Sequence, residues 1–487
     1  MLLINFIKEL KKEKLLISCD EKNLDIKYIS YDSRDLKKDN LFVCKGVEFK
    51  KEYLLDSIDK GTIAYVSEID YEVDIPKIIV TDARKAMAVV GKVFYEDERV
   101  LTTISVTGTK GKTTATAFIS NILHVHAKMK TAYMSSIDYY TGVREDDAHN
   151  TTEESIEIYK RIKEIKDSNI KYLTMETSSQ AINLDRIYGM SFDYGVFVNI
   201  GKDHISPKEH KDLEEYISAK IAIINMCKKA VIYKHLDNYD EIIKRITVPY
   251  LTYGMTKDCD MYIKDIEKDG KINRFTVIYN KTSEIYEIAM LGSFNVLNAA
   301  SAILIAKQIG VSYKDIYKGL LNTYIPGRMN VYNEENFPII VDYAHNEISY
   351  RVLLQALKDE YPTKNLKLVF GICGEKGVNR RKDMATLAGK YASYIYLTQD
   401  DPGKYTTKET AEFITPYLDE LDASYEIVDD RNDAIRKALK EATKDDLIAI
   451  LGKGNERYQS TSKGYIPMLS DVDVVEEYLS LDKEEVG

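Results

Sequence analysis

The feature that most constrains this chain is a short loop, residues 107–114, with the sequence Thr-Gly-Thr-Lys-Gly-Lys-Thr-Thr. It follows the apolar run 101–106 and precedes the apolar segment 115–123, which is the order strand, glycine loop, helix. In such a loop the glycines let backbone N–H groups converge on an anion at a helix N-terminus. The order therefore predicts an α/β unit that binds a nucleoside triphosphate.

The loop is shorter than the common G-x-x-x-x-G-K-[ST] pattern, because position 106 is a valine and the first glycine is Gly108. We expect Lys112 to place a positive charge on the β- and γ-phosphates and Thr113 to offer a hydroxyl to Mg²⁺. The residues of this loop predicted to bind ATP are Gly108, Thr109, Lys110, Gly111, Lys112, Thr113 and Thr114. The alternative, a chance Gly-Lys-Thr-Thr in a solvated loop, is disfavoured by the flanking strand and helix.

Composition indicates a large enzyme. The 487 residues suffice for about three domains, and 44% of them are apolar. A net charge of −10 argues against nucleic acid or an acidic membrane surface as the main partner. No apolar run reaches the ~18 residues of a membrane span, so we expect a cytoplasmic protein without membrane insertion. The five cysteines include no C-x-x-C pair, so neither a disulfide framework nor a structural zinc site is predicted.

Strands alternate with helical patterns, which predicts parallel sheets covered by helices. We expect three α/β domains: residues 1–98, a central P-loop domain at 99–325, and a Rossmann-like domain at 326–487, with a hinge at the helix-breaking segment 325–328. The expected strands lie at 41–44, 63–66, 77–80, 172–176, 194–198, 230–233, 338–342, 366–372, 393–397 and 447–451. The expected helices lie at 295–309, 313–321, 349–358 and 382–391. Alternation over 262–290 predicts a small antiparallel sheet.

Two side chains at strand ends are candidate metal ligands. Glu176 ends the apolar strand 172–176, where open α/β sheets place ligands, and a carboxylate there can hold Mg²⁺ near Thr113. The alternative is a glutamate that caps the next helix. His204 follows the strand 194–198 and is a candidate second ligand, although a lone histidine is more often an ordinary surface or core residue.

Seven segments in a fixed order carry a resemblance to a known family: residues 107–114, 175–179, 199–204, 217–220, 292–300, 326–330 and 341–346. In this order the chain resembles the Mur ligase family, the ATP-dependent amide-forming enzymes of cell-wall precursor synthesis. Within that family, residues 32–34, 150–152 and 452–459 resemble the branch that joins an amino acid to the γ-carboxyl of D-Glu in UDP-N-acetylmuramoyl-L-Ala-D-Glu. The resemblance implies that the first domain binds UDP.

The resemblance also implies roles for single residues. Lys220 matches a lysine that the family carries as a CO₂-derived carbamate, whereas alone it would pass for a solvated lysine. The implied metal ligands are Thr113, Glu176, His204 and Lys220, and the implied catalytic residues are Lys112, Glu176, His204 and Lys220. Asn295 and Asn298 are expected to face adenine, and Arg328 and Asp342 to reach the nucleotide phosphates and ribose. Segment 205–210 departs from the family's usual Leu-Asp-Tyr-His.

On the acceptor side, the resemblance assigns Ser33 and Arg34 to the uridine end. It assigns Thr151, Thr152, Ser178 and Arg186 to the pyrophosphate and muramoyl-peptide. Arginine and hydroxyl groups at helix termini suit such an acidic ligand. The chain departs from the family at Gln180, where histidine is usual, and at residues 50–52, where Asp-Gly-His is usual.

The added amino acid is predicted from the loop Asp400-Asp401-Pro402-Gly403. Family members that add diaminopimelate read Asp-Asn-Pro-Arg there, and the arginine grips the distal carboxylate. Gly403 lacks that guanidinium, and Asp401 with Glu456 favours a distal ammonium. Arg381 is expected to hold the α-carboxylate, and Asp400 and Gly452 to complete the site. The prediction is L-lysine or L-ornithine, the alternative being a loop that merely varies in sequence.

The predicted phosphate-binding loop and metal ligands suit the synthesis of an amide. Amide formation from a carboxylate and an amine is uphill in water, so it needs an acyl phosphate made from ATP in a closed site. We expect closure about Gly327, a monomer, ATP and Mg²⁺ as cofactors, and UDP-N-acetylmuramoyl-dipeptide and a free amino acid as substrates. One alternative is a related ligase that acts on another carboxylate, of the polyglutamate or polymer-forming type. Another is an inactive binding protein, against which Lys112, Thr113, Glu176 and Lys220 argue together.

Overall fold

The structure, a computed structural model, describes residues 1–46, 49–96, 101–148, 150–201, 205, 209–269, 272–332, 335–375 and 377–485. By its internal contacts the chain divides into two compact units. The first contains Met1–Asp265, Thr276–Tyr286 and Leu297–Leu320, and the second contains Ile266–Phe275, Glu287–Val296 and Leu321–Gly487. The division into three domains at residues 98 and 325 stays a prediction. Within the described ranges, no helix is both long and apolar enough to cross a membrane.

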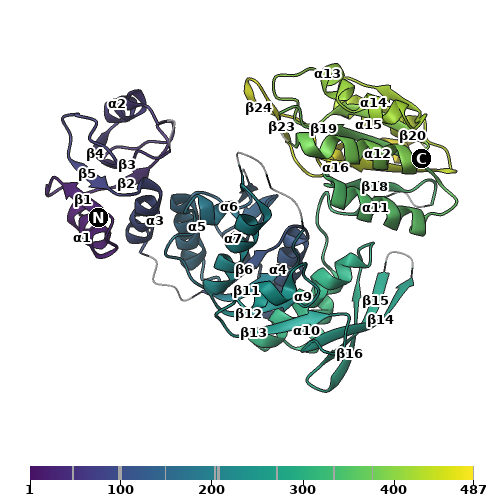
Figure 1. Ribbon diagram of the computed structural model, residues 1–487, viewed down its shortest axis with the longest axis horizontal. Coiled ribbons are helices and arrows are strands. Elements are labelled where there is room, and N and C mark those ends of the chain that lie inside the picture. The colour runs from purple at the N-terminus through teal and green to yellow at the C-terminus, as the bar shows by residue number, and fades with distance from the viewer. Residues whose placement is uncertain are drawn as a thin grey trace. The chain divides into compact units, whose positions relative to one another are not determined.

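The N-terminal part is a five-stranded sheet with the order β1-β5-β4-β3-β2 (Figure 1). Its strands are β1 (Leu16–Cys19), β2 (Tyr28–Ser30), β3 (Asn40–Val43), β4 (Thr62–Ser67) and β5 (Lys77–Val80), and its helices are α1 (Leu3–Lys12), α2 (Lys51–Asp59) and α3 (Ala83–Phe94). Successive side chains of β3 point to opposite faces. Leu41 packs in the core with residues of α1 and α3, and Phe42 packs with Leu54 of α2. The strands predicted at 41–44, 63–66 and 77–80 are confirmed.

The central sheet has eleven strands in the order β16-β15-β14-β13-β12-β11-β6-β10-β7-β8-β9. They are β6 (Thr102–Thr107), β7 (Ala132–Met134), β8 (Asp138–Tyr140), β9 (Glu145–Asp147), β10 (Tyr172–Glu176), β11 (Phe192–Phe197), β12 (Cys227–Tyr233), β13 (Tyr250–Gly254), β14 (Met261–Asp269), β15 (Ile272–Tyr279) and β16 (Thr282–Ile288). β6 lies between β10 and β11 and is parallel to both. The carboxyl ends of these three strands therefore meet at the loop 107–114.

One expectation for this sheet was wrong. The segment 262–290 does not form a separate small sheet, because β14 pairs in parallel with β13 and continues the central sheet. The helices of this part are α4 (Lys112–Ala127), α5 (Ser155–Asp167), α6 (Gln180–Asn183), α7 (Leu213–Asn225), α8 (Tyr239–Ile243), α9 (Phe294–Ile309) and α10 (Tyr313–Leu321). Phe118 and Ile122 on α4 are fully buried, which anchors the helix that follows the loop.

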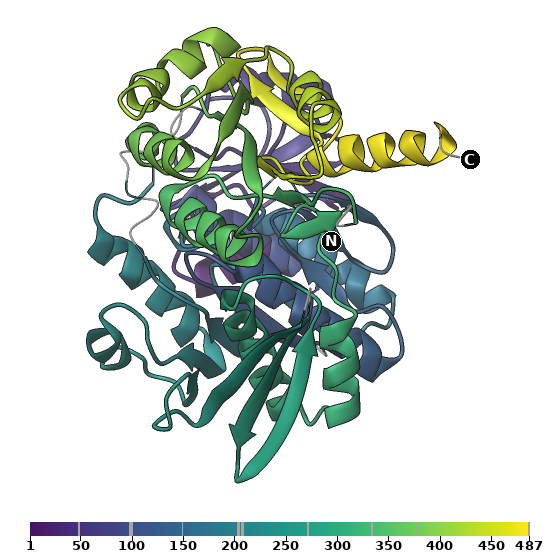
Figure 2. The ribbon, with the colours of Figure 1, turned by 90° about the vertical axis from the view of Figure 1, so that its right-hand side faces the viewer.

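The C-terminal part is a six-stranded sheet with the order β17-β18-β22-β19-β20-β21. Its strands are β17 (Asn330–Tyr332), β18 (Ile339–Asp342), β19 (Asn365–Ile372), β20 (Tyr394–Gln399), β21 (Tyr425–Ile427) and β22 (Asp446–Leu451), followed by the hairpin β23 (Tyr458–Thr461) and β24 (Gly464–Pro467). Its helices are α11 (Glu347–Glu360), α12 (Arg381–Tyr391), α13 (Thr407–Glu412), α14 (Thr415–Asp419), α15 (Arg431–Lys440) and α16 (Asp471–Glu485). Within the six-stranded sheet, β17 is antiparallel to β18 and the other paired strands are parallel. Figure 2 shows α16, in yellow, leading to the C-terminus.

A buried ion pair joins α16 to this sheet. Nε and Nη2 of Arg431, on α15, each lie 2.7 Å from a carboxylate oxygen of Asp471, the first residue of α16. The two side chains are only 2% and 0% exposed. Arg431 also donates to the carbonyl oxygens of Gln399 and Leu451, at the ends of β20 and β22. The guanidinium therefore connects two strand ends and two helices.

We expect Asp471→Asn to lower the free energy of unfolding of this part by about 3–5 kcal/mol, because it leaves a buried guanidinium without its counter-ion. Denaturant titration of the full chain measures the change. Glu477→Gln is the matched control, since it breaks the exposed pair of Arg436 and Glu477 between the same two helices, and such a pair contributes about 0–1 kcal/mol. Equal effects of the two substitutions would contradict this account.

Candidate active site

The predicted phosphate-binding loop, residues 107–114, is called the phosphate loop below. Two glycines and one asparagine determine its shape. A Cβ atom at Gly108 would lie 2.3 Å from Val198, and one at Gly111 would lie 2.4 Å from Oδ1 of Asn298, so neither position has room for a side chain. Asn199, just beyond β11, accepts hydrogen bonds through Oδ1 from the backbone N–H groups of Thr109 (3.0 Å) and Lys110 (2.8 Å). Sequence reasoning did not assign this role to Asn199, because its partners lie about 90 residues away.

Two lysines lie beside the same loop carbonyl. Nζ of Lys112 donates to the carbonyl oxygens of Gly108 (3.1 Å) and Thr109 (3.2 Å). Lys220, on α7, is 1% exposed, and its Nζ donates to the same oxygen of Gly108 at 2.8 Å. Both ammonium groups thus lie at the N-terminal end of α4, where the helix dipole also attracts anions. Thr114 is buried on the first turn of the helix.

Glu176, Ser136 and Thr113 form a hydrogen-bonded chain next to this loop. The Glu176 side chain is fully buried. Its Oε1 accepts from the backbone N–H of Ser136 at 2.9 Å, and the hydroxyl oxygens of Ser136 and Thr113 are 3.0 Å apart. Among the residues that the structure describes, Oε2 of Glu176 has no hydrogen-bond partner. A buried carboxylate oxygen beside two hydroxyls suits a hard cation such as Mg²⁺, so these residues fit the predicted metal site.

Ser136 was not singled out in the sequence, because its place becomes visible only when β7 pairs with β10. His204 lies outside the described residues. The nearby His210 is fully buried, with Nε2 2.8 Å from Oγ of Ser179 and Nδ1 3.2 Å from Nδ2 of Asn183. His210 therefore links α6 to the segment that precedes α7.

Several predicted acceptor residues come together after β10. Oγ1 of Thr152 donates to the carbonyl oxygen of Glu176 (3.1 Å) and accepts from the backbone N–H of Ser178 (2.9 Å). Arg186 donates to the carbonyl oxygen of Thr152 at 2.8 Å, and its buried Nε has no partner in the described ranges. Thr151 is half-buried beside them. These contacts assemble hydroxyl and guanidinium donors at one point.

Three cationic side chains surround the buried Glu154 in the same region. Oε1 of the buried Glu154 lies 2.8 Å from Nζ of Lys45 and 3.3 Å from Nη2 of Arg186, and Oε2 lies 3.5 Å from Nη1 of Arg84. Burial would raise the pKa of Glu154, but these cations, Lys45 first, hold it below its usual range. Three cations therefore face one carboxylate, which suits an anionic ligand.

The residues predicted to bind the uridine end are more exposed to solvent than the group around Thr152. Ser33 is half-buried, and its carbonyl oxygen accepts from Nζ of Lys60. The side chain of Arg34 is 88% exposed and pairs with Asp32 at 2.6 Å. The structure brings neither Ser33 nor Arg34 into the group around Thr152 by any hydrogen bond among the described residues.

The remaining predicted nucleotide residues lie on α9 and near β18. Nδ2 of the buried Asn295 donates to the carbonyl oxygen of Leu291 at 2.7 Å. The Asp342 carboxylate accepts from the backbone N–H groups of Met329 and Ala344, both at 2.8 Å. The guanidinium of Arg328 lies 4.1 Å from the centre of the Tyr343 ring. Asp342 therefore fixes the turn that carries Arg328.

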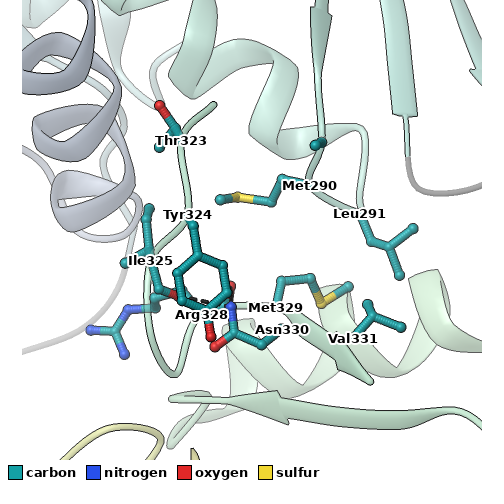
Figure 3. Close-up of a pocket in the computed structure, with 10 residues that line it drawn as sticks. Met290, Leu291, Thr323, Tyr324, Ile325, Arg328, Met329, Asn330 and Val331 are labelled. Atoms are coloured by element: carbon teal, nitrogen blue, oxygen red, sulfur yellow. Dashed lines mark hydrogen bonds between the residues drawn. The ribbon is translucent and has the colours of Figure 1, made fainter. Parts of the chain in front are cut away.

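This turn borders a cavity of about 170 Å³. Figure 3 shows Met290, Tyr324 and Met329 around the cavity, with the guanidinium of Arg328 directed away from it. The adjoining Gly327 has a φ of 71°, and a Cβ atom there would lie 2.3 Å from the backbone nitrogen of Asn455. The turn thus packs directly against the loop that follows β22.

Arg381, predicted to hold an α-carboxylate, lies at the start of α12. Its Nη2 donates to the carbonyl oxygen of Gly374 at 2.7 Å, and its guanidinium lies 3.9 Å from the centre of the Phe413 ring. Nε is buried and has no hydrogen-bond partner among the described residues. Burial lowers the pKa of Arg381 below its usual value, and an anion could accept a hydrogen bond from the buried Nε.

The acidic residues of the predicted amino-acid site are paired with an ammonium group of the protein itself. Lys453, after β22, lies 3.0 Å from Oδ1 of Asp401 and 2.5 Å from Oε2 of Glu456. Asp400 is buried next to them, and burial raises its pKa to about 6. A Cβ atom at Gly452 would lie 2.8 Å from Oδ2 of Asp400. Sequence reasoning missed Lys453, since lysines are usually solvated.

Gly403 has a φ of 61°, and a Cβ atom there would lie 2.6 Å from a carboxylate oxygen of Glu375. This backbone conformation favours glycine, whereas the carboxylate of Glu375 is the end of a flexible side chain and imposes little constraint. The loop therefore has no guanidinium at this position.

Comparison with known proteins agrees with this geometry. The family description "Mur ligase middle domain" matches residues 106–306, and "Mur ligase, glutamate ligase domain" matches residues 327–454. The chain is 36% identical over 461 residues to the UDP-N-acetylmuramoyl-L-alanyl-D-glutamate–L-lysine ligase of Streptococcus pneumoniae, covering 93% of this chain and 92% of that protein. It is 36% identical over 467 residues to the UDP-N-acetylmuramyl-tripeptide synthetase of Lactococcus lactis subsp. cremoris, covering 94% of each.

Among solved structures, a UDP-N-acetylmuramoyl-L-alanyl-D-glutamate–2,6-diaminopimelate ligase superposes with a TM-score of 0.65 at 24% identity, over 96% of this chain and 98% of that one. At this identity the likeness shows the fold. The sequence relatives match the chain over more than nine tenths of its length. The first family description covers residues 107–114 of the phosphate loop, and the second covers Asp400, Asp401 and Lys453. The chain therefore belongs to the Mur ligase family.

Proposed function

We propose that this ligase joins L-lysine or L-ornithine to the γ-carboxyl of D-Glu in UDP-N-acetylmuramoyl-L-Ala-D-Glu, with cleavage of ATP to ADP and phosphate. The observation that carries the choice of amino acid is the ammonium of Lys453 between Asp401 and Glu456. These carboxylates bind a lysine side chain of the protein itself, while Gly403 supplies no guanidinium for a distal carboxylate. The L-lysine ligase named among the relatives supports the same choice.

The proposed reaction has two steps. The γ-carboxylate of the acceptor attacks the γ-phosphorus of ATP and ADP leaves, and the α-amine of the amino acid then attacks the acyl phosphate and phosphate leaves. Lys112 and the loop N–H groups balance charge on the transferred phosphoryl group. Mg²⁺, held by Thr113, Glu176 and His204 with a carbamate on Lys220, would neutralise the phosphate oxygens.

The acceptor has a proposed place as well. Thr151, Thr152, Ser178 and Arg186 would hold the pyrophosphate and muramoyl-peptide, because their donors converge beside the cations that surround Glu154. Ser33 and Arg34 would contact the uridine end from the domain 1–98. Asn295, Asn298, Arg328 and Asp342 would serve the nucleotide, with closure between the domains 99–325 and 326–487. We also propose a monomer that acts in the cytoplasm.

Steady-state kinetics with purified UDP-N-acetylmuramoyl-L-Ala-D-Glu test the amino acid. We expect the kcat/KM for L-lysine or L-ornithine to exceed that for meso-diaminopimelate by at least about tenfold. A buried distal carboxylate without its bidentate partner would lose roughly 2–5 kcal/mol. The same acceptor without the uridine nucleotide is the control, and we expect little turnover with it. A higher kcat/KM for diaminopimelate would refute the proposed role of Asp401 and Gly403.

A further inference from the structure

The ammonium of Lys453 lies within the proposed amino-acid site and is part of the protein. The side chain is 1% exposed, and its Nζ contacts one carboxylate from the loop after β20, Asp401, and one from its own loop, Glu456. Burial would lower the pKa of Lys453, but the charges of Asp400, Glu456 and Asp401 raise it above its usual value. Lys453 therefore carries a full positive charge at neutral pH.

The charges around Lys453 do not cancel. Three carboxylates, of Asp400, Asp401 and Glu456, face this one ammonium. The nearby guanidinium of Arg431 is already paired with Asp471 at 2.7 Å. Lys453 and the three carboxylates together thus keep a net negative charge. Without Lys453 this negative charge would be larger by one unit. A substrate with one side-chain ammonium reduces that negative charge further, whereas a neutral side chain leaves it unchanged.

Asp401 and Glu456 are each held by a second donor. The backbone N–H of Ser460 donates to Oδ1 of Asp401 at 2.9 Å, and the hydroxyl of Tyr343 donates to Oε1 of Glu456 at 2.6 Å. These bonds do not depend on Lys453. A substitution of Lys453 can therefore change the charge of the group while both carboxylates keep a positioned partner.

We propose that Lys453 is a specificity-determining residue, whose ammonium sets how strongly the site demands a cationic side chain on the incoming amino acid. This inference rests on the proposed function. An internal ammonium a few ångströms from the incoming one opposes it through like-charge repulsion, and Glu456 attracts it. Removal of either charge should therefore shift the selectivity in opposite directions.

The test measures kcat/KM for L-lysine relative to L-norleucine, which has the same chain without the ε-ammonium. The proteins are the parent, Lys453→Met, Glu456→Gln and the double variant. We expect Lys453→Met to raise the ratio at least about tenfold and Glu456→Gln to lower it at least about tenfold. The double variant restores the parent's net charge, and its ratio should return to within about threefold of the parent's. Because each value is a ratio of two kcat/KM values for the same protein preparation, it does not depend on the fraction of enzyme that is active.

Lys463→Met is the matched control, because it removes the same charge from the exposed turn between β23 and β24, and its ratio should equal the parent's. If Lys453→Met does not fold, Lys453→Gln removes the charge and keeps hydrogen-bond donors. A parent that uses neither L-lysine nor L-ornithine would refute the proposed function. A parent that prefers L-lysine, with single variants of unchanged ratio or a double variant that does not return toward the parent, would refute the role of Lys453 alone.

Discussion

Lys112→Ala should lower turnover by about 10³-fold or more and leave the fold intact, which makes it one of the two largest effects we expect. The ammonium of Lys112 lies at the N-terminal end of α4, hydrogen-bonded to the loop carbonyls. In the proposed reaction this charge is needed most when the phosphoryl group is transferred, so its loss raises the barrier to that step. Release of phosphate under saturating acceptor and amino acid measures the effect.

Lys171→Ala is the matched control, since Lys171 is exposed and precedes β10, at the end of the strand opposite to Glu176. It removes the same charge from the same sheet and should leave the rate within about twofold. Glu176→Gln should behave like Lys112→Ala, because it removes the charge of the buried carboxylate whose Oε2 has no partner within the described part of the chain. Thermal unfolding should show both variants folded. Activity near the parent's in either variant would contradict the assignment of the phosphate loop.

Lys220→Ala should be nearly inactive, and a short carboxylic acid such as formate or acetate should restore part of the rate. Lys220 is buried at the edge of the phosphate loop, with Nζ 2.8 Å from the carbonyl oxygen of Gly108. In the proposed state the neutral amine has added CO₂ and released a proton, so the side chain ends in a carboxylate. A small carboxylate that diffuses into the space left by Lys220→Ala can supply the same oxygen ligands.

Lys228→Ala, at an exposed lysine on β12, is the control and should neither lose activity nor respond to formate. Rescue should also be specific, in that formate should not restore Lys112→Ala. Full activity of the parent in CO₂-free buffer, together with electron density for an unmodified ammonium, would exclude the carbamate. In that case Lys220 would act through its hydrogen bond to Gly108.

The sequence predicted the elements that depend on local patterns. The continuous apolar runs of β5 and β10 and the periodic pattern of α10 are found at the predicted residues, Lys77–Val80, Tyr172–Glu176 and Tyr313–Leu321. Alternation with period two predicted strands at 262–290, but it could not identify their neighbours, so the continuation of the central sheet was missed. The hairpin β23–β24 was also missed, since its residues are partly or fully exposed and carry little apolar signal.

The same limit applies to the candidate site. Glycine spacing identified the phosphate loop, because the chemistry needs those residues within eight consecutive positions. Asn199 and Ser136 support that loop and Glu176 from distant strands, and nothing next to them in the sequence indicates their partners. Lys453 has the local signature of any solvated lysine. Only the sheet order, in which β19 lies between β20 and β22, brings the loops after β20 and β22 together, surrounds Lys453 with carboxylates and removes it from water.

The contact between Gly327 and Gly454 limits how members of this family can exchange parts. A Cβ atom on Gly454 would lie 2.7 Å from the carbonyl oxygen of Gly327, and both residues have positive φ, 56° and 71°. The turn at 325–328 and the loop after β22 therefore accept side chains at neither position. A loop grafted at 452–459 must therefore keep glycine at position 454. A graft that places a side chain there should lower the free energy of unfolding of this part of the chain.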